Sequence, residues 1–364
     1  MLITTIDELR LHSPAHALDT LDGLTGFIDN SEHDFLLEKL GEPLYQKLCQ
    51  WYDDNQGVMS RVAQGAAGEN DLPPFNHLCL MAQRVVAFDA LGRAIGMQIV
   101  SVHNSGVNQM TAEDYDKPSK DSIDTYRTTC VTEAHAALNR LLRQLEQWAK
   151  KPDPAEGEGD DYDKERKEII DLWKQSSYYY LAAGLLIPSC EVMMRYLNIY
   201  DSREKFIQLL PDMQFIQEEV IAPAIGEELL QNLVTYARDG KLPEEAPEGT
   251  EALYQQTVHK LRRILVALLV GRTAVLKYSK EQKIQAHDDG VRLLTNLTDF
   301  LKRNKLLPNE NENENENCDE NENHNCDENE NHNGDENENK DEDKKEHRHC
   351  HERAEPACWT PPLF

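Results

Sequence analysis

The sequence "LGEPLYQKL" occupies Leu40–Leu48, and "IGEELLQNL" at Ile225–Leu233 is nearly the same stretch again. Five identities stand at a constant offset of 185, in the order glycine, glutamate, leucine, glutamine, leucine. A glycine that interrupts an apolar helical pattern ends one helix. Pro43 suits the first turn of the next helix, because that position needs no N–H donor. We therefore predict a sharp helix–turn–helix corner at Gly41 and a second one at Gly226.

A second pair of segments repeats further along the chain. The stretch "QRVVAFDALGR" at 83–93 corresponds to "RRILVALLVGR" at 262–272. At an offset of 179, Arg84, Gly92 and Arg93 match Arg263, Gly271 and Arg272. Two matched blocks in the same order indicate a tandem duplication. The alternative is two amphipathic helices that are alike by chance; we favour duplication because glycine and arginine match as well as leucine.

Apolar residues recur at helical spacing through most of the chain before residue 309, which predicts an all-α fold. The main helices are expected at about 31–52, 77–98, 121–148 and 284–304, with residues 53–74 as a loop. Residues 97–111 differ, because β-branched residues flank the turn sequence "NSG". This pattern predicts a small protruding β-hairpin, with Val102 and Val107 on either side of the turn.

The domain organisation follows from these repeats and from composition. We predict two tandem related helical domains, residues 1–150 and 162–308, the first of which carries the hairpin. Residues 151–161 are rich in proline, glycine and like charges, which is typical of a linker. Residues 309–364 form an Asn/Glu-rich, acidic, low-complexity tail with Cys and His. We expect this tail to be disordered, because it has almost no apolar side chain to bury.

The tail repeats octads such as "CDENENHN" and contains a cluster of metal-ligating residue types. Thiolate and imidazole are ligands that zinc and nickel prefer. However, five residues separate Cys318 from His324, whereas structural zinc sites use short pairs such as C-x2-C. We interpret the cluster as an expanded repeat that binds metal only adventitiously. Its members are Cys318, His324, Cys326, His332, His347, His349, Cys350, His351 and Cys358.

The charge balance argues against two classes of partner. The 364-residue chain has a formal net charge of −28, of which the tail, with 19 acids and 5 bases, supplies half. Non-specific binding of nucleic acid and of anionic membranes both need clustered Lys and Arg, so we expect neither partner. The start "MLITTIDELR" lacks a signal-peptide pattern, and the apolar stretches are too short to span a bilayer. We expect a cytoplasmic protein with reduced cysteines.

The sequence also lacks motifs for catalysis. It has no HExxH, no recognisable nucleophile motif and no glycine-rich phosphate loop. We therefore predict a protein without enzymatic activity, catalytic residues or cofactor. There are two hypotheses for Arg93 and Arg272. Either they bind a carboxylate of a partner protein, or each pairs with an acid of its own domain.

Several segments in a fixed order resemble an uncharacterised family encoded in phages and prophages of gut anaerobes. They are "DFLLEKLGEPLYQKL", the valine-rich segment with "NSGV", "KPSKDSIDTYR" and "SREKFIQLLPDMQFIQEEVIAPAIGEELLQNL". The resemblance spans about residues 1–305 and excludes the tail. It implies an all-helical protein similar to head–tail connector (neck) proteins, which assemble as rings between portal and tail. It carries no catalytic residues.

Two hypotheses for function follow. The first is a non-enzymatic virion or virion-assembly protein, located in the host cytoplasm or the virion, whose partners are itself and other virion proteins such as portal or tail components. The alternative is a cytoplasmic helical binding module or metal-handling protein that uses its His/Cys-rich tail. Under the first hypothesis the hairpin is a contact element, because an isolated two-stranded ribbon is marginally stable and has open edges. It either packs on its own domain or pairs with a neighbour.

Overall fold

The structure is a computed structural model. It describes residues 1–307 except 14–18, 64–71, 99, 104–105, 110–118, 153–159, 177, 183, 245 and 247–248. Residues Met1–Asn309 form one compact unit. The prediction of a mostly helical chain is confirmed for this unit. The expected linker lies partly, and the expected tail wholly, outside the described residues.

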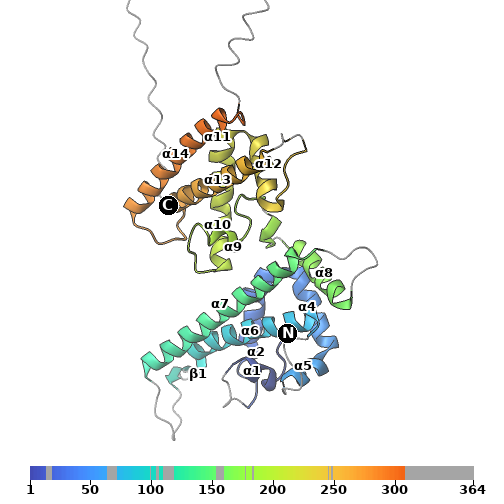
Figure 1. The fold of residues 1–364 in the computed structure, drawn as a ribbon. Coiled ribbons are helices and arrows are strands. Elements are labelled where there is room, and N and C mark those ends of the chain that lie inside the picture. The colour runs from blue at the N-terminus through green and yellow to red at the C-terminus, as the bar shows by residue number, and fades with distance from the viewer. Residues whose placement is uncertain are drawn as a thin grey trace, which may run out of the picture. The chain divides into compact units, whose positions relative to one another are not determined.

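The helices before residue 175 make up the first set (Figure 1). They are α1 (Ile6–His12), α2 (Thr25–Ser31), the π-helix η1 (Glu32–Leu36), α3 (Leu37–Leu40), α4 (Glu42–Asp54), α5 (Gln56–Ala63), α6 (Pro74–Gln98), α7 (Lys120–Lys150) and α8 (Asp161–Lys174). Helix α5 falls inside residues 53–74, so the prediction of a loop there is wrong. Its apolar residues Met59 and Val62 are buried in the core, which stabilises one more short helix.

The helices after residue 179 make up the second set. They are the 3-10 helix η3 (Tyr180–Ala182), α9 (Cys190–Met193), α10 (Arg203–Ile216), the π-helix η4 (Gln217–Ile221), α11 (Ala222–Ile225), α12 (Glu227–Asp239), α13 (Glu251–Arg272) and α14 (Lys280–Arg303). Helix α6 packs along α7, and α13 packs along α14, so each set contains a long helix pair (Figure 1).

Each set makes its corner in the same way. A five-residue π-helix leads into a four-residue α-helix, a glycine follows, and a 13-residue helix begins. All these boundaries differ by 185 residues. Gly41 has φ 80° and ψ 154°, and Gly226 has φ 86° and ψ 141°. This region of backbone conformation is open almost only to glycine, which explains why glycine stands at both corners.

Two buried leucines outside any helix are held by side chains in the same way. The Leu2 N–H donates to Glu32 Oε1 at 2.6 Å, and Gln83 Nε2 donates to the Leu2 carbonyl at 2.6 Å. In the second set, the Leu186 N–H donates to Gln217 Oε1 at 2.9 Å, and Arg262 Nε donates to the Leu186 carbonyl at 2.7 Å. We call each arrangement a backbone clamp: Leu2 with Glu32 and Gln83, and Leu186 with Gln217 and Arg262.

The clamps follow the same numbering offsets as the sequence repeats. Glu32 and Gln217 are 185 apart and open the two π-helices, while Gln83 and Arg262 are 179 apart and lie in α6 and α13. Both leucines are fully buried. A buried backbone group without a partner costs about 1 to 3 kcal/mol, so each clamp allows an irregular segment to enter the core. Thr5 and Ser189 then cap the next helix, each three residues after its leucine.

The long helix pairs also correspond in detail. A Cβ placed on Gly92 would contact Cys130 and Val131 of α7, and a Cβ placed on Gly271 would contact Lys283 and His287 of α14. Val131 and His287 are 156 residues apart. The same offset relates buried leucines on the inner faces of α7 and α14: Leu138, Leu141 and Leu145 against Leu294, Leu297 and Leu301. A side chain is excluded at Gly271, where α13 and α14 cross closely, whereas a Cβ at Gly92 would meet α7 at ordinary van der Waals distance.

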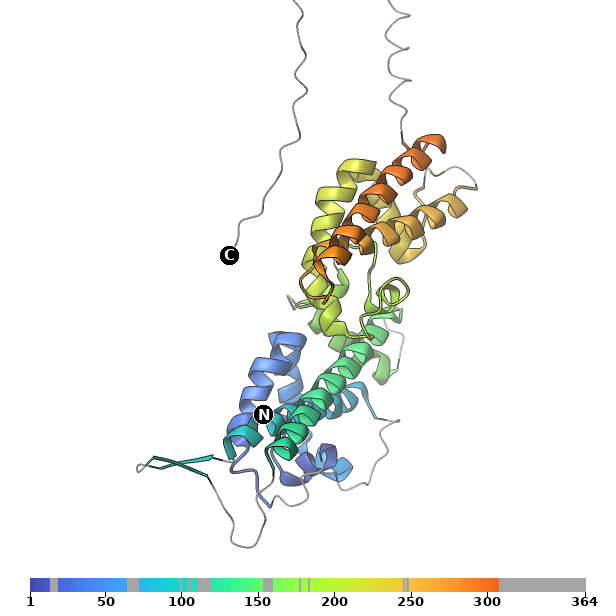
Figure 2. The same cartoon turned by 90° about the vertical axis from the view of Figure 1, so that its left-hand side faces the viewer.

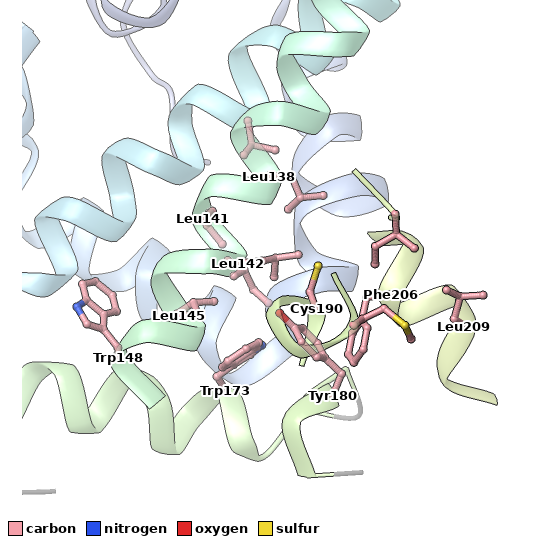
Figure 3. Close-up of a cluster of buried hydrophobic side chains, with 14 of the residues drawn as sticks. Leu138, Leu141, Leu142, Leu145, Trp148, Trp173, Tyr180, Cys190, Phe206 and Leu209 are labelled. Atoms are coloured by element: carbon pink, nitrogen blue, oxygen red, sulfur yellow. The ribbon is translucent and has the colours of Figure 1, made fainter. Parts of the chain in front are cut away.

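A cluster of buried hydrophobic side chains, to which α7 contributes leucines, includes aromatic rings of α8, η3 and α10 (Figure 3). The Trp173 ring meets Tyr180 edge-on at 5.6 Å between centroids, and Tyr180 meets Phe206 at 6.1 Å. Helix α8 itself packs against α4, α6 and α7 of the first set. The sequence-based boundary grouped residues 162–174 with the second domain, whereas their apolar face, with Ile169 and Trp173, is buried against the first set.

The two strands are β1 (Val100–His103) and β2 (Gly106–Gln109). They pair antiparallel, with Val100 opposite Gln109 and Val102 opposite Val107. The strands follow α6, and Figure 2 shows them as a narrow ribbon that extends away from the neighbouring helices. The side chains of the strands lie outside the described part of the structure.

Candidate functional site

The two arginines singled out by the sequence pair with acids near their own helices. Arg93 Nε donates to Asp89 Oδ2 at 2.6 Å, and its Nη1 donates to Asp34 Oδ2 at 3.0 Å. Arg272 Nε donates to Asp212 Oδ1 at 3.0 Å, and its guanidinium lies 3.7 Å from the Phe215 ring centroid. Both guanidiniums are therefore engaged within the chain, although their partners are not at matched positions.

The corner glycines differ in their surroundings. A Cβ on Gly41 would collide with the Ser176 side chain, which follows α8, whereas nothing lies within 4 Å of the corresponding point on Gly226. Gly41 thus has a packing reason as well as a conformational one. Both glycines are positions where the backbone conformation of the corner calls for glycine.

The hairpin places the two valines directly opposite each other, since Val102 is the register partner of Val107. This register concerns the backbone alone, because the side chains of both valines lie outside the described part of the structure.

The Cys and His residues of the tail lie outside the described residues. Within the described part of the chain, no three His, Cys, Asp or Glu residues come together as they would around a metal ion. None of the described helices combines the length and the apolarity needed to cross a bilayer.

A buried ion pair between α7 and α10 was not predicted from the sequence. Glu146 of α7 and Arg203 of α10 are 1% and 3% exposed. Arg203 donates to Glu146 Oε2 through Nε at 3.1 Å and through Nη2 at 2.9 Å. The Tyr180 hydroxyl donates to Glu146 Oε1 at 2.7 Å. Each carboxylate oxygen of Glu146 therefore has a donor, as burial of this charge requires.

The same cluster extends towards the surface through Asp201. Arg203 Nη1 donates to the Asp201 carbonyl at 3.2 Å and to its Oδ1 at 3.0 Å. Arg143 of α7 pairs with the other oxygen of Asp201. Burial raises the pKa of the neighbouring Cys190 thiol to about 12, which keeps it protonated and unreactive. Each charged side chain of this cluster has a partner within the chain. The cluster therefore has a structural role, because it connects α7 to α10.

Two further buried carboxylates, those of Glu8 and Glu32, also have hydrogen-bond donors within the first set of helices. Glu8 accepts from the Tyr52 hydroxyl at 2.8 Å and from the Thr5 N–H at 3.1 Å. Glu32 accepts from the Tyr45 hydroxyl at 2.8 Å besides its bond to Leu2. Burial and the neighbouring carboxylate raise the pKa of both tyrosines. The phenols are therefore donors throughout the ordinary pH range, which suits a structural role.

Comparison with known proteins gives one result. A family described as "Family of unknown function (DUF6712)" matches residues 36–157, which run from η1 to just beyond α7. No curated protein and no solved structure matches the chain. The matched segment contains the corner at Gly41, α6, the hairpin and α7, so the resemblance covers the core of the first set of helices.

Proposed function

We propose that this chain is a non-enzymatic virion or virion-assembly protein, similar to head–tail connector proteins, that acts through protein–protein contacts. It would work in the cytoplasm of the host bacterium or within the virion. The sequence resemblance to a phage and prophage family supports this assignment. The structural observation behind the proposal is the repeated backbone clamp. The two sets of helices share the repeated helices and also the side-chain hydrogen bonds that hold a buried leucine in each core.

The repeat supports a tandem duplication of one helical unit. Leu2, Glu32 and Gln83 correspond to Leu186, Gln217 and Arg262, although only the leucine is identical. Matched contacts between three separate segments favour duplication over chance similarity between amphipathic helices. We place the first copy at about residues 1–176, with α8 as an addition to it, and the second copy at about 184–305.

A duplicated unit suits a protein that assembles. Oligomers are built from repeated, symmetry-related surfaces, and a chain that carries one unit twice offers each surface twice. Such a chain can bridge equivalent neighbours in a ring. The acidic character of the chain also fits a channel through which DNA moves, because it removes attraction to the phosphates. Portal, tail components and further copies of the chain are the partners that this proposal implies.

The hairpin is the contact element in this proposal. Its two strands pair only with each other among the described residues, so both outer edges have backbone groups available for a neighbouring strand. Like-charged subunits need a local contact of this kind, because their net charges repel.

The test is the particle mass of the full chain across a concentration series, measured by light scattering. Replacing Val102 and Val107 with Asp should shift the mass towards monomer and leave the helical circular dichroism unchanged. The matched control is Val291→Asp on α14, where the native side chain is 45% exposed. A wild-type chain that stays monomeric at high concentration and in salt contradicts self-assembly through the hairpin. The remaining hypothesis would then be that the hairpin docks onto a pre-formed portal ring.

A further inference from the structure

Each long helix pair has a hollow at the same place. Between α6 and α7 lies a hollow of about 280 Å³, and between α13 and α14 lies one of about 320 Å³. Lining residues of the first hollow correspond to lining residues of the second: Met81 to Lys260, Arg84 to Arg263, and Arg140 to Asn296. The first two pairs share the offset of 179 and the third the offset of 156. The hollow is thus part of the repeated unit.

The two hollows have the same chemical character. Their floors are apolar, with Leu80 and Ala137 in the first and Ile264 and Leu297 in the second, all of them buried. Their rims carry cations, although the chain as a whole has a net charge of −28. An apolar floor beneath a basic rim fits a ligand that combines an apolar group with a carboxylate.

The first hollow already has a carboxylate at its rim. Glu133 Oε2 lies 3.8 Å from Arg84 Nη2 and 3.9 Å from Arg140 Nη2, so the two arginines share one acid at long distance. In addition, Arg84 Nε is buried and has no hydrogen-bond acceptor among the described residues. The rim therefore has donor capacity beyond what Glu133 uses.

The second hollow lacks this internal acid. The residue that corresponds to Glu133 at the offset of 156 is Asp289, and it accepts hydrogen bonds from Arg292 at 2.8 Å and from Gln285 at 3.2 Å. Arg263 is exposed and has no ion-pair partner within the described ranges. The Lys260 ammonium lies 3.9 Å from the Phe300 ring centroid, close to the same rim. Among the described residues, no carboxylate forms an ion pair with Arg263.

We infer that the two hollows are equivalent docking sites for an acidic, amphipathic segment of a partner protein. An apolar side chain of that segment enters each hollow, and its carboxylates pair with Arg84 in the first copy and with Arg263 in the second. Glu133 competes for the first site, so the second site binds more tightly. This inference is independent of whether the chain is a virion component.

A protein segment fits these sites better than a nucleic acid. The apolar floors offer nothing to a sugar–phosphate backbone, and a long polyanion is repelled by the net charge of the chain. A short segment interacts mainly with charges within about 8 Å at physiological salt, so the net charge of the whole chain affects it less than it affects a long polyanion.

The test uses the full chain and a fluorescein-labelled amphipathic peptide whose apolar face is leucine and whose polar face is glutamate. Titration followed by anisotropy and calorimetry should give two sites per chain, and the same peptide with glutamine in place of glutamate should bind about tenfold more weakly. Arg84→Glu should remove the weaker site and Arg263→Glu the tighter one. Glu133→Gln should tighten the weaker site. Arg127→Glu, on an exposed part of α7, is the control and should change neither site.

Three outcomes would overturn the inference. The first is equal binding of the glutamate and glutamine peptides, and the second is binding that both arginine variants leave unchanged while their circular dichroism stays native. The third is displacement of the peptide by single-stranded DNA at lower concentration than by unlabelled peptide, which would assign the sites to nucleic acid. A loss of binding that accompanies loss of folding is resolved by Glu133→Gln, because that variant is expected to gain affinity.

Discussion

Replacing Arg203 with Met tests how much the buried ion pair between Glu146 of α7 and Arg203 of α10 contributes to stability. The substitution keeps much of the apolar volume but removes the guanidinium that donates to Glu146 and to Asp201. Glu146 then keeps the Tyr180 hydroxyl alone and remains a charge that is 1% exposed. Removing one partner of a buried ion pair costs about 3 to 5 kcal/mol, so we expect a loss of that size in the free energy of unfolding.

Urea unfolding of the full chain, followed by circular dichroism, measures this loss. The double variant Arg203→Met/Glu146→Gln should recover more than half of it, because the buried charge is gone and glutamine still accepts from Tyr180. Arg238→Met serves as the control, since Arg238 is half exposed and pairs with its neighbour Asp239. It should leave the unfolding midpoint unchanged. A loss below about 1 kcal/mol in the single variant, or no recovery in the double variant, would refute this reasoning.

Further outcomes are expected from the same chemistry. Gly226→Ala should cost about 1 to 3 kcal/mol by backbone strain, and Gly41→Ala more, because its Cβ also collides with a side chain; equal losses in urea unfolding would contradict this. Burial lowers the pKa of His12 to about 4, so the wild type should lose up to about 3 kcal/mol more than His12→Gln between pH 7 and pH 4. A chain that ends at Pro308 should keep its melting temperature, and the peptide 309–364 should bind zinc only weakly; one tight equivalent would contradict the latter.

The sign of the His12 effect follows from proton binding. Because the pKa of His12 is depressed in the folded state, the unfolded chain binds one more proton between about pH 6.5 and pH 4. Stability from this group is therefore present above that range and is lost as the pH falls. His12 Nε2 lies 3.3 Å from Gln83 Oε1, so glutamine at position 12 keeps a polar partner for this side chain. Carboxylates that protonate in the same pH range change the stability of the variant and of the wild type equally, so their contribution cancels in the comparison.

The sequence predicted the corners because their residue types are dictated by the backbone. The combination of a φ of 80° or 86° with an extended ψ is open almost only to glycine, so Gly41 and Gly226 could be recognised in the sequence at a fixed offset. The clamps could not be predicted, because several residue types can make the same hydrogen bonds. A glutamate or a glutamine can accept from a backbone N–H, and a glutamine or an arginine can donate to a carbonyl, so Gln83 and Arg262 have the same role with different side chains.

The buried ion pair and the place of α8 needed contacts across the chain. Glu146 and Arg203 are 57 residues apart, and no local pattern reveals such a pair. One signal was present: Glu146 follows Leu145 on the apolar face of a long helix, where a charge requires a partner. For α8, composition suggested a linker before residue 162, but the helix after that linker turns back onto the first set and buries Trp173 there.

Amide hydrogen exchange at the two clamped leucines tests the central claim, that one core-building unit occurs twice. In ¹⁵N-leucine-labelled protein, the Leu2 and Leu186 resonances can be assigned through Leu2→Ile and Leu186→Ile variants. Neither residue is in a helix or a strand, yet each N–H is buried and donates to a side-chain oxygen. We predict strong and similar protection at both amides, close to that of buried helical amides. Exchange at the rate of an unstructured peptide at either leucine would contradict the repeated clamp and the duplication that it supports.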